Sequence, residues 1–283
     1  MINNSLQTCL LVPAAALLTL LICADAFSQN VKVNISTKDE IQADLKKVPC
    51  KSEGRLPGVK SLFESFGAAK SDYSEENNDG VRNFVVAKKG KSGGTVVVGA
   101  HYDKAGGGCG AIDNWSGVVM LAHLYRTIKD IPTDKNFLFV AFDKEEEGLV
   151  GSGKMAKEIP KEKRIDYCAM VNLDSFGFGY PQVLTHISSP KMTKMAKTLA
   201  DELKMPYAEA SLSGLADSDS TSFINKDIPA ISFHGLSNDW QKYLHTSNDK
   251  IENLRPDSVF IGYQYILRYL LKIDAADCQS FRK

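Results

Sequence analysis

Three consecutive glutamates follow a strongly apolar run and pose a problem of charge. Residues 137–142 (F-L-F-V-A-F) are typical of a buried strand, and Glu145, Glu146 and Glu147 come soon after its end. Like charges repel one another, and a buried strand does not end on three of them without compensation. The three carboxylates therefore either form a solvated turn or lie beside something positive.

Imidazole and carboxylate side chains also follow the apolar runs at residues 95–100 and 168–173, and others lie on two loops. These side chains are His101, Asp103, Asp113, Asp174 and His245. Zinc in proteins is bound by histidine nitrogen and carboxylate oxygen, and catalytic zinc sites keep a position open for water. The residue types therefore predict a metal site, although they do not choose zinc over cobalt or manganese.

A pair of metal ions a few ångströms apart needs an anion that bridges them, because the bridge offsets the repulsion between the cations. Asp113 is the candidate bridge, since its loop is bounded by glycines and can approach closely. His101 and Asp174 could complete one metal. Glu146 and His245 could complete the other.

Glu145 and Glu146 cannot be expected to bind the same metal, because adjacent side chains leave the backbone in different directions. A free carboxylate beside a metal-bound water is well placed as a general base, and Glu145 is the candidate. Glu147 is expected to face solvent.

Apolar strands and helices alternate along most of the chain. Expected strands cover residues 84–89, 95–103, 136–143, 168–174, 182–188 and 228–235, and expected helices cover 116–128, 151–159, 190–203 and 256–272. Residues 27–60 are interpreted as a leader plus one helix, and residues 71–82 as a turn. This alternation predicts an α/β fold with a mostly parallel sheet covered on both faces. Ligands of such sheets lie beyond the carboxyl ends of the strands, where the candidate residues stand.

The composition suits a soluble globular protein. The chain has 283 residues, of which 43% are hydrophobic and 24% charged. Lys plus Arg and Asp plus Glu both number 34, so no basic excess points to a nucleic-acid partner or to anionic lipid.

The first 26 residues read as a secretory signal peptide, with cleavage after Ala26 and one domain over residues 27–283. The protein is then exported, to the periplasm or the extracellular space, without stable membrane association after signal removal. A retained anchor helix is the alternative, but Pro13 and the shortness of the apolar run argue against a full span. Lipidation at Cys23 is a further alternative, although Ile22 is large for that processing.

The four cysteines that follow permit two disulfides in three connectivities, and the sequence does not choose among them. They are Cys50, Cys109, Cys168 and Cys278. A bond between Cys50 and Cys278 would join the two ends of the chain, and Cys109 could tie its loop through a disulfide. Four buried or free thiols are the alternative. None of the four lies in a recognisable nucleophile context.

Six motifs occur in an order that resembles the M28 family of zinc aminopeptidases. They cover residues 99–103 (G-A-H-Y-D), 110–117 (G-A-I-D-N-W-S-G), 145–152 (E-E-E-G-L-V-G-S), 172–174 (N-L-D), 218–223 with 228–230 (S-D-S-T-S-F and I-P-A) and 245–249 (H-T-S-N-D). One motif alone would be weak, whereas all six in family order are specific.

The resemblance implies a three-layer α/β/α sandwich with a mixed, mostly parallel sheet. It also implies two zinc ions per chain, one held by His101 and Asp174, the other by Glu146 and His245. Asp113 would bridge the two ions. The implied substrates are peptides with a free N-terminus, from which the enzyme would remove N-terminal residues.

The resemblance further implies that Glu145 is the general base for a water bridging the metals. Asp103 would orient His101, as partners of metal-bound histidines usually do. Some family members place Tyr directly before the late histidine, but Leu244 occupies that position here and Tyr243 lies one earlier. The role of that Tyr therefore stays open.

Two alternative functions remain. Glutaminyl cyclases share this scaffold but use a single zinc to cyclise N-terminal Gln. The ligand set does not exclude them, although the loop at 105–110 and the D-N-W-S-G segment look more like the hydrolases. An inactive member that binds peptides or a receptor would be marked by a lost ligand, and none of the five is missing.

Several other residues have plainer interpretations. His123 and His186 are expected to be ordinary core or surface histidines, and His234 could line the pocket. Ser218 and Asp219 could form a helix cap.

Overall fold

The computed structural model describes residues 33–282, which fold around one eight-stranded sheet. The strands are β1 (Tyr73–Asn78), β2 (Val81–Lys88), β3 (Thr95–His101), β4 (Asn136–Phe142), β5 (Tyr167–Phe176), β6 (Gln182–Leu184), β7 (Ala208–Ala210) and β8 (Ala230–Gly235). Their order in the sheet is β1-β2-β4-β3-β5-β8-β6-β7. The central strands β4, β3, β5 and β8 run parallel, whereas β1–β2, β2–β4 and β6–β8 pair antiparallel. The predicted mixed, mostly parallel sheet is confirmed.

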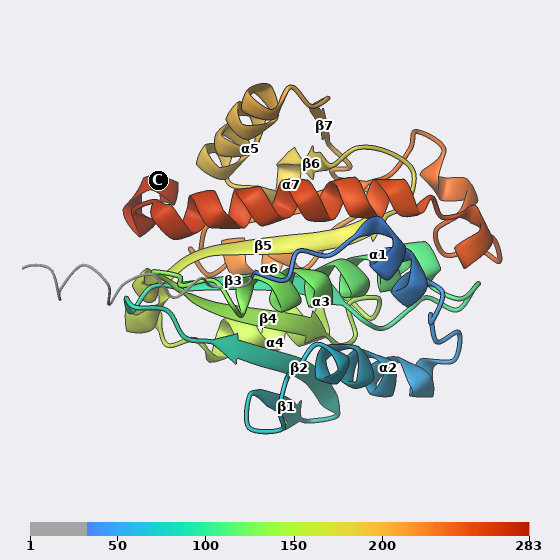
Figure 1. Ribbon diagram of the computed structural model, residues 1–283, viewed down its shortest axis with the longest axis horizontal. Coiled ribbons are helices and arrows are strands. Elements are labelled where there is room, and N and C mark those ends of the chain that lie inside the picture. The colour runs from blue at the N-terminus through green and yellow to red at the C-terminus, as the bar shows by residue number, and fades with distance from the viewer. Residues whose placement is uncertain (1–32, 283) are drawn as a thin grey trace, which may run out of the picture. The chain divides into compact units, whose positions relative to one another are not determined.

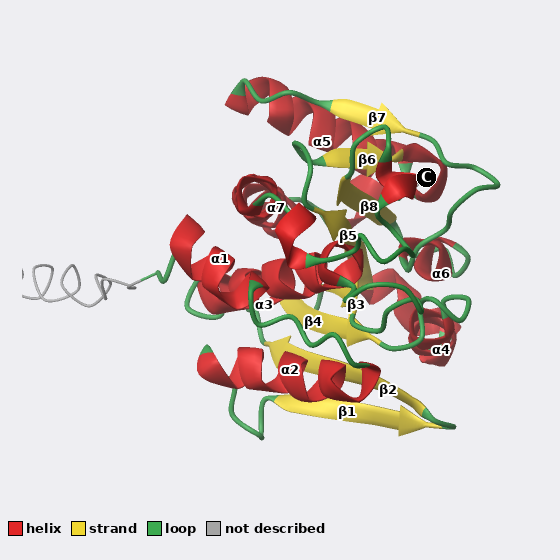
Figure 2. Cartoon of the chain, turned by 90° about the vertical axis from the view of Figure 1, so that its right-hand side faces the viewer, coloured by secondary structure: helices red, strands yellow, loops and turns green. Residues whose placement is uncertain are grey.

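Helices cover both faces of this sheet. They are α1 (Lys38–Leu45), α2 (Ser52–Ser65), α3 (Ser116–Ile128), α4 (Val150–Glu158), α5 (Pro190–Leu203), α6 (Ser220–Ile224) and α7 (Pro256–Ala275). Figure 1 shows α7 lying along the sheet, and Figure 2 shows α4 and α6 on the opposite side from α1, α3 and α7. The predicted three-layer α/β/α arrangement is therefore confirmed.

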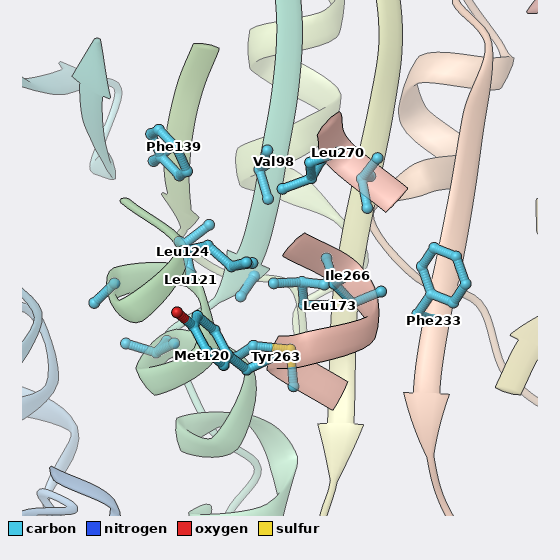
Figure 3. Packing of buried hydrophobic residues seen from close by; sticks show 14 of the residues in the cluster. Val98, Met120, Leu121, Leu124, Phe139, Leu173, Phe233, Tyr263, Ile266 and Leu270 are labelled. Carbon is cyan, nitrogen blue, oxygen red and sulfur yellow. The ribbon is translucent and has the colours of Figure 1, made fainter. Parts of the chain in front are cut away.

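The larger apolar core lies between the sheet and α3 and α7 (Figure 3). Twelve of the thirteen residues of α3 are buried, which explains its almost continuous apolar sequence. The longer α7 packs beside α3 and buries Tyr263, Ile266 and Leu270. Each fully buried side chain of this size contributes about 1.5–3 kcal/mol. This packing holds the parallel strands, and so their carboxyl ends, in fixed positions.

Two local predictions were wrong. The segment expected to hold one helix has two, and Thr37 and Glu40 form a capping box at the start of α1. Residues expected to be a turn instead form β1 and the start of β2. Only Asp79 and Gly80 make the turn, and both have positive φ, as in the two-residue Asp-Gly hairpin. The polar composition of β1 obscured this signal.

The four cysteines form two disulfides, Cys50–Cys109 and Cys168–Cys278. A Cys50–Cys278 bond is therefore wrong. Cys168 lies in β5 and meets the segment that follows α7, whereas Cys50 lies beside the loop that precedes Asp113. The predicted signal peptide at residues 1–26 and the lipidation alternative at Cys23 lie outside the described residues. Within residues 33–282, no helix has the combined length and apolar character needed to cross a membrane.

Candidate metal centre

The structure brings all the predicted site residues to one edge of the sheet. His101 ends β3, Asp174 lies near the end of β5, and Glu145 and Glu146 follow β4. Asp113 lies in the turn before α3, and His245 lies on the loop after β8. Because β3, β4, β5 and β8 are parallel, their carboxyl ends meet there.

Asp113 lies between the two histidines and contacts both. Its Oδ1 is 3.1 Å from Nε2 of His101, and its Oδ2 is 3.1 Å from Nε2 of His245. The side chain of Asp113 is 7% exposed. One carboxylate that presents a different oxygen to each half of a site has the geometry that a bridging ligand requires.

The remaining ligands divide between these two halves. Oδ1 of Asp174 is 3.6 Å from Nε2 of His101, and Oε2 of Glu146 is 3.1 Å from Nε2 of His245. Two overlapping groups have their donor atoms within 4.8 Å of one another: His101 with Glu145 and Asp174, and His101 with Asp113 and Glu146. Glu145 and Glu146 therefore fall in different groups, as the direction of their side chains predicts.

Asp103 fixes the backbone of the glutamate pair. Its two carboxylate oxygens accept hydrogen bonds from the backbone N–H groups of Glu145 and Glu146, both at 3.1 Å. Its Oδ1 also lies 3.3 Å from Nδ1 of His101, a close contact without hydrogen-bond geometry. Asp103 was predicted to orient His101, and the structure adds the glutamate backbone to its contacts. Glu147 is exposed and lies 3.4 Å from Lys144, as expected for a solvated side chain.

Ser218 contacts Asp174 in a way the sequence did not indicate. Its hydroxyl donates to Oδ2 of Asp174 at 2.6 Å and accepts from Nδ2 of Asn172, also at 2.6 Å. Ser175 donates to the other oxygen of Asp174 at 2.9 Å. Asp219 occupies the N-cap position of α6, but its side chain makes no capping hydrogen bond. Asp219 is fully buried instead, and burial raises the pKa of its carboxyl to about 7.

Asn114 and Asp249 hold the turn that carries Asp113. Oδ1 of Asn114 accepts from the backbone N–H groups of Gly117 and Ser175, and its Nδ2 donates to the carbonyl of Leu173. A Cβ at Gly117 would lie 2.3 Å from Oδ1 of Asn114, which explains the glycine. The carboxylate of Asp249 accepts from the N–H groups of Ile112 at 2.7 Å and Asp113 at 3.2 Å. The bridge candidate is thus tied to β5 and to the His245 loop.

The electrostatics of the cluster show how much negative charge converges there. Burial raises the pKa of Glu145 well above its usual value, and nearby carboxylates reinforce this effect. Burial alone would lower the pKa of His101, but the charge of Glu145 and contacts with other carboxylates raise it well above its usual value. Contacts with Asp113 and then Glu146 raise the pKa of His245 to about 10. The directions of these pKa shifts indicate an excess of negative charge, which a bound cation would offset.

The donor set fits zinc. It offers two imidazole nitrogens and the carboxylates of Asp113, Glu146 and Asp174, and the carboxylate of Glu145 lies close to His101 and Asp174. His245 has a positive φ of 60°, which is uncommon outside glycine and is found at functional sites.

One pocket contains this cluster and an apolar wall. Its volume is about 240 Å³, and Glu145 and all five candidate ligands line it. The wall is formed by Leu184, Leu212, Leu215, Leu236, Trp240 and Leu244. A larger hollow of about 430 Å³ lies beside Pro229 and Phe281, away from these ligands.

His234 lines the same pocket and differs from the other histidines. Its Nδ1 accepts the backbone N–H of Leu236 at 3.2 Å, so its proton resides on Nε2, which has no partner among the described residues. Burial lowers the pKa of His234 to about 4, which keeps the ring neutral. His123 is a core residue bonded to Ser36 and Asp44, and His186 contacts the backbone of residues 212 and 216.

A family comparison agrees with this geometry. The model of Peptidase family M28 matches residues 83–269, which include every predicted ligand. The chain belongs to peptidase family M28. The family resemblance inferred from the six motifs is confirmed.

Individual relatives of this M28 chain are distant. It is 27% identical over 259 residues to leucine aminopeptidase 1 of Colletotrichum graminicola, which covers 82% of this chain and 64% of that protein. The chain thus spans less than two thirds of the length of that relative.

Solved structures share the fold. A zinc aminopeptidase from Bacillus subtilis superposes with a TM-score of 0.61 at 24% identity, covering 71% of this chain and 53% of that one. A glutaminyl cyclase from an Acidobacteriales bacterium gives a TM-score of 0.74 at 16% identity, covering 89% and 99%. At these identities the likeness shows the fold alone.

Proposed function

We propose that this chain is a zinc-dependent aminopeptidase that removes N-terminal residues from peptides. The observation that carries the proposal is the pocket where Glu145 and the five candidate ligands meet an apolar wall. Family membership supports it, as do relatives named leucine aminopeptidases and zinc aminopeptidases.

The pocket suits a peptide with a free N-terminus. Its lining residues include five carboxylates, namely Asp113, Glu145, Glu146, Asp174 and Asp217, and none of the described lining residues is Lys or Arg. Two divalent cations would still leave a net negative charge, which attracts the ammonium of a free N-terminus. The apolar wall would bury the first side chain, and its small volume limits how much peptide enters.

The residues of the chain divide the chemical work. Zinc ions held by His101 with Asp174 and by Glu146 with His245, and bridged by Asp113, would polarise the scissile carbonyl and acidify water. Glu145 would accept a proton from the attacking water on its carboxylate and pass it to the nitrogen of the departing amine. Burial raises the pKa of the Glu145 carboxyl above its usual value, which favours the protonated form during this transfer. The backbone bonds to Asp103 keep Glu145 in place.

We also infer that the protein acts outside the cytoplasm. Two disulfides in the described part of the chain support an oxidising compartment, because such bonds are rare in reducing cytosol. The secretory signal predicted at residues 1–26 would be consistent with this inference.

The test compares two reactions of the purified protein. A panel of aminoacyl reporters measures hydrolysis, and ammonia release from an N-terminal Gln peptide measures cyclisation. We expect hydrolysis that chelation abolishes and zinc restores, with two zinc ions per chain by elemental analysis. Ammonia release without hydrolysis would instead identify a cyclase, and neither reaction with little bound zinc would indicate an inactive binding protein.

Glu145→Gln is the substitution that tests the general base. The substitution keeps size and polarity but removes the basic carboxylate, so kcat should fall about 10²–10⁴-fold. Bound zinc should be unchanged. A variant that turns over at near-normal rates would exclude Glu145 as the base.

A further inference from the structure

A fully buried arginine lies behind the loop that carries Asp113. Arg55 belongs to α2 and is 0% exposed. Its Nε donates to the carbonyl of Tyr102 at 2.6 Å, and its Nη1 lies within donor distance of the carbonyls of Cys109 at 3.2 Å and Gly110 at 3.1 Å. Tyr102 directly follows His101, and Gly110 precedes Asp113 by three residues. One guanidinium therefore binds the backbone close to two of the predicted ligands, His101 and Asp113.

The position of Arg55 is unusual because no described carboxylate forms a direct ion pair with it. Burying a charged guanidinium costs several kcal/mol unless it is compensated. Burial lowers the pKa of Arg55 to about 10, so it stays charged at neutral pH, and the charges of Asp103 and then Asp249 oppose this shift. Asp113 and Glu146 act in the same direction. The charge of Arg55 is thus balanced by the carboxylates of the site together and not by a direct ion pair with one of them.

A covalent bond reinforces the same contact. Cys50 lies just before α2 and is bonded to Cys109, and Nη1 of Arg55 also lies 3.4 Å from the carbonyl of Pro49. The guanidinium lies 5.4 Å from the ring centre of Trp115, which follows Asp113 by two residues. The segment at 49–55 is therefore linked to the loop at 109–110 by a disulfide and by hydrogen bonds.

The opposite side of this loop contacts the His245 segment. The backbone N–H of Cys109 donates to the carbonyl of Asp249 at 2.7 Å. A Cβ at Gly108 would lie 2.6 Å from the carbonyl oxygens of Thr246 and Asp249, so only glycine permits the approach. If the loop moved, the Asp113 and His245 segments would move with it.

We propose that Arg55 is a positioning residue that holds the Asp113 loop in its metal-binding geometry. It lies outside the family-matched region of residues 83–269, so the segment preceding that region takes part in the site. Loss of the guanidinium frees the backbone carbonyls of Tyr102, Cys109 and Gly110 and so loosens the chain beside His101 and Asp113. The half of the site formed by Glu146 and His245 depends on this loop more than the half formed on β3 and β5.

The test measures zinc affinity directly, and it rests on the proposed function only in assuming that the wild type binds zinc. Arg55→Met keeps the apolar stem and removes the donors. In competition with a chelator, the zinc dissociation constant of the weaker site should rise about 10–100-fold. This is the usual effect of losing a residue that supports the metal ligands. Arg55→Lys keeps N–H donors without the planar fork and should recover part of the affinity.

Arg126→Met is the matched control, because Arg126 lies over Phe66, pairs with Glu40 and takes no part in the site. Its zinc affinity should equal that of the wild type. Thermal unfolding of the zinc-free variants separates a structural role from the proposed one. The inference would be overturned if Arg55→Met had a lower Tm but unchanged zinc affinity. Should that variant not fold, wild-type zinc affinity in Arg55→Lys would overturn it. A wild type that binds no zinc would instead contradict the proposed function.

Discussion

The two halves of the candidate metal centre are built in different ways. His101 and Asp174 come from β3 and β5, and their side chains are 1% and 14% exposed. Glu146 and His245 come from loops, and the side chain of His245 is 59% exposed. The first half inherits its geometry from the packed sheet, whereas the second depends on turns, glycines and the contacts around Asp113. Rigid placement of the loop ligands therefore depends more on supporting contacts between loops than placement of the strand ligands does.

The largest effect is expected where the halves join. Asp113→Ala removes the carboxylate that contacts both histidines, so both zinc sites should weaken and turnover should fall to background. Elemental analysis after dialysis against a weak chelator checks this expectation. Two zinc ions per chain still held tightly would show that Asp113 does not bridge.

Sequence reasoning succeeded where a residue's position follows from the sheet. His101, Asp174 and the glutamates stand at the ends of apolar runs, and parallel strands bring such ends together. Asp113 and His245 lie on loops and were proposed from their residue types, with the family resemblance as further support, and the structure places them with the others. The catalytic and ligand roles of these residues stay predictions.

The residues that sequence reasoning missed act through contacts between distant segments. Arg55 binds backbone carbonyls, which carry no side-chain signature, and Asp249 binds backbone N–H groups. Ser218 was considered only as a cap, because nothing local shows that it faces Asp174. The disulfide pairing also depends on which segments meet in space, which spacing along the chain does not encode.

A smaller difference should separate the two halves in stability. In zinc-free protein, His101→Ala removes a buried side chain and should lower stability by about 1–3 kcal/mol. His245→Ala removes less packing because the ring is largely exposed, but it also takes a charged partner from Asp113 and Glu146, so it should lower stability by about 0.5–1 kcal/mol. Thermal unfolding of both variants with chelator present compares their stabilities. In a separate measurement without chelator, both variants should bind less zinc than the wild type. Equal losses of Tm would show that burial does not distinguish the two halves.

The smallest expected effect lies outside the metal centre and serves as a reference for pH. Burial lowers the pKa of His123, against the opposing influence of Asp44. The unfolded chain then binds more protons than the folded chain once the pH falls below about 6.5, so acid destabilises the fold. His123→Gln cannot titrate, and its loss of Tm between pH 7 and 5 should be smaller by on the order of 2–4 °C. If Tm fell equally with pH in the wild type and in His123→Gln, titration of His123 would not explain the loss of stability in acid.

The order of the ligands along the chain has a consequence for the cell that makes the protein. Binding donors are spread from His101 to His245, and the arginine behind them comes from a still earlier helix. A nascent polypeptide emerging from the ribosome cannot assemble the centre until its last third has been translated and packed. The same dispersal means that a proteolytic cut that releases any one of these segments leaves no fragment with the complete set of candidate ligands.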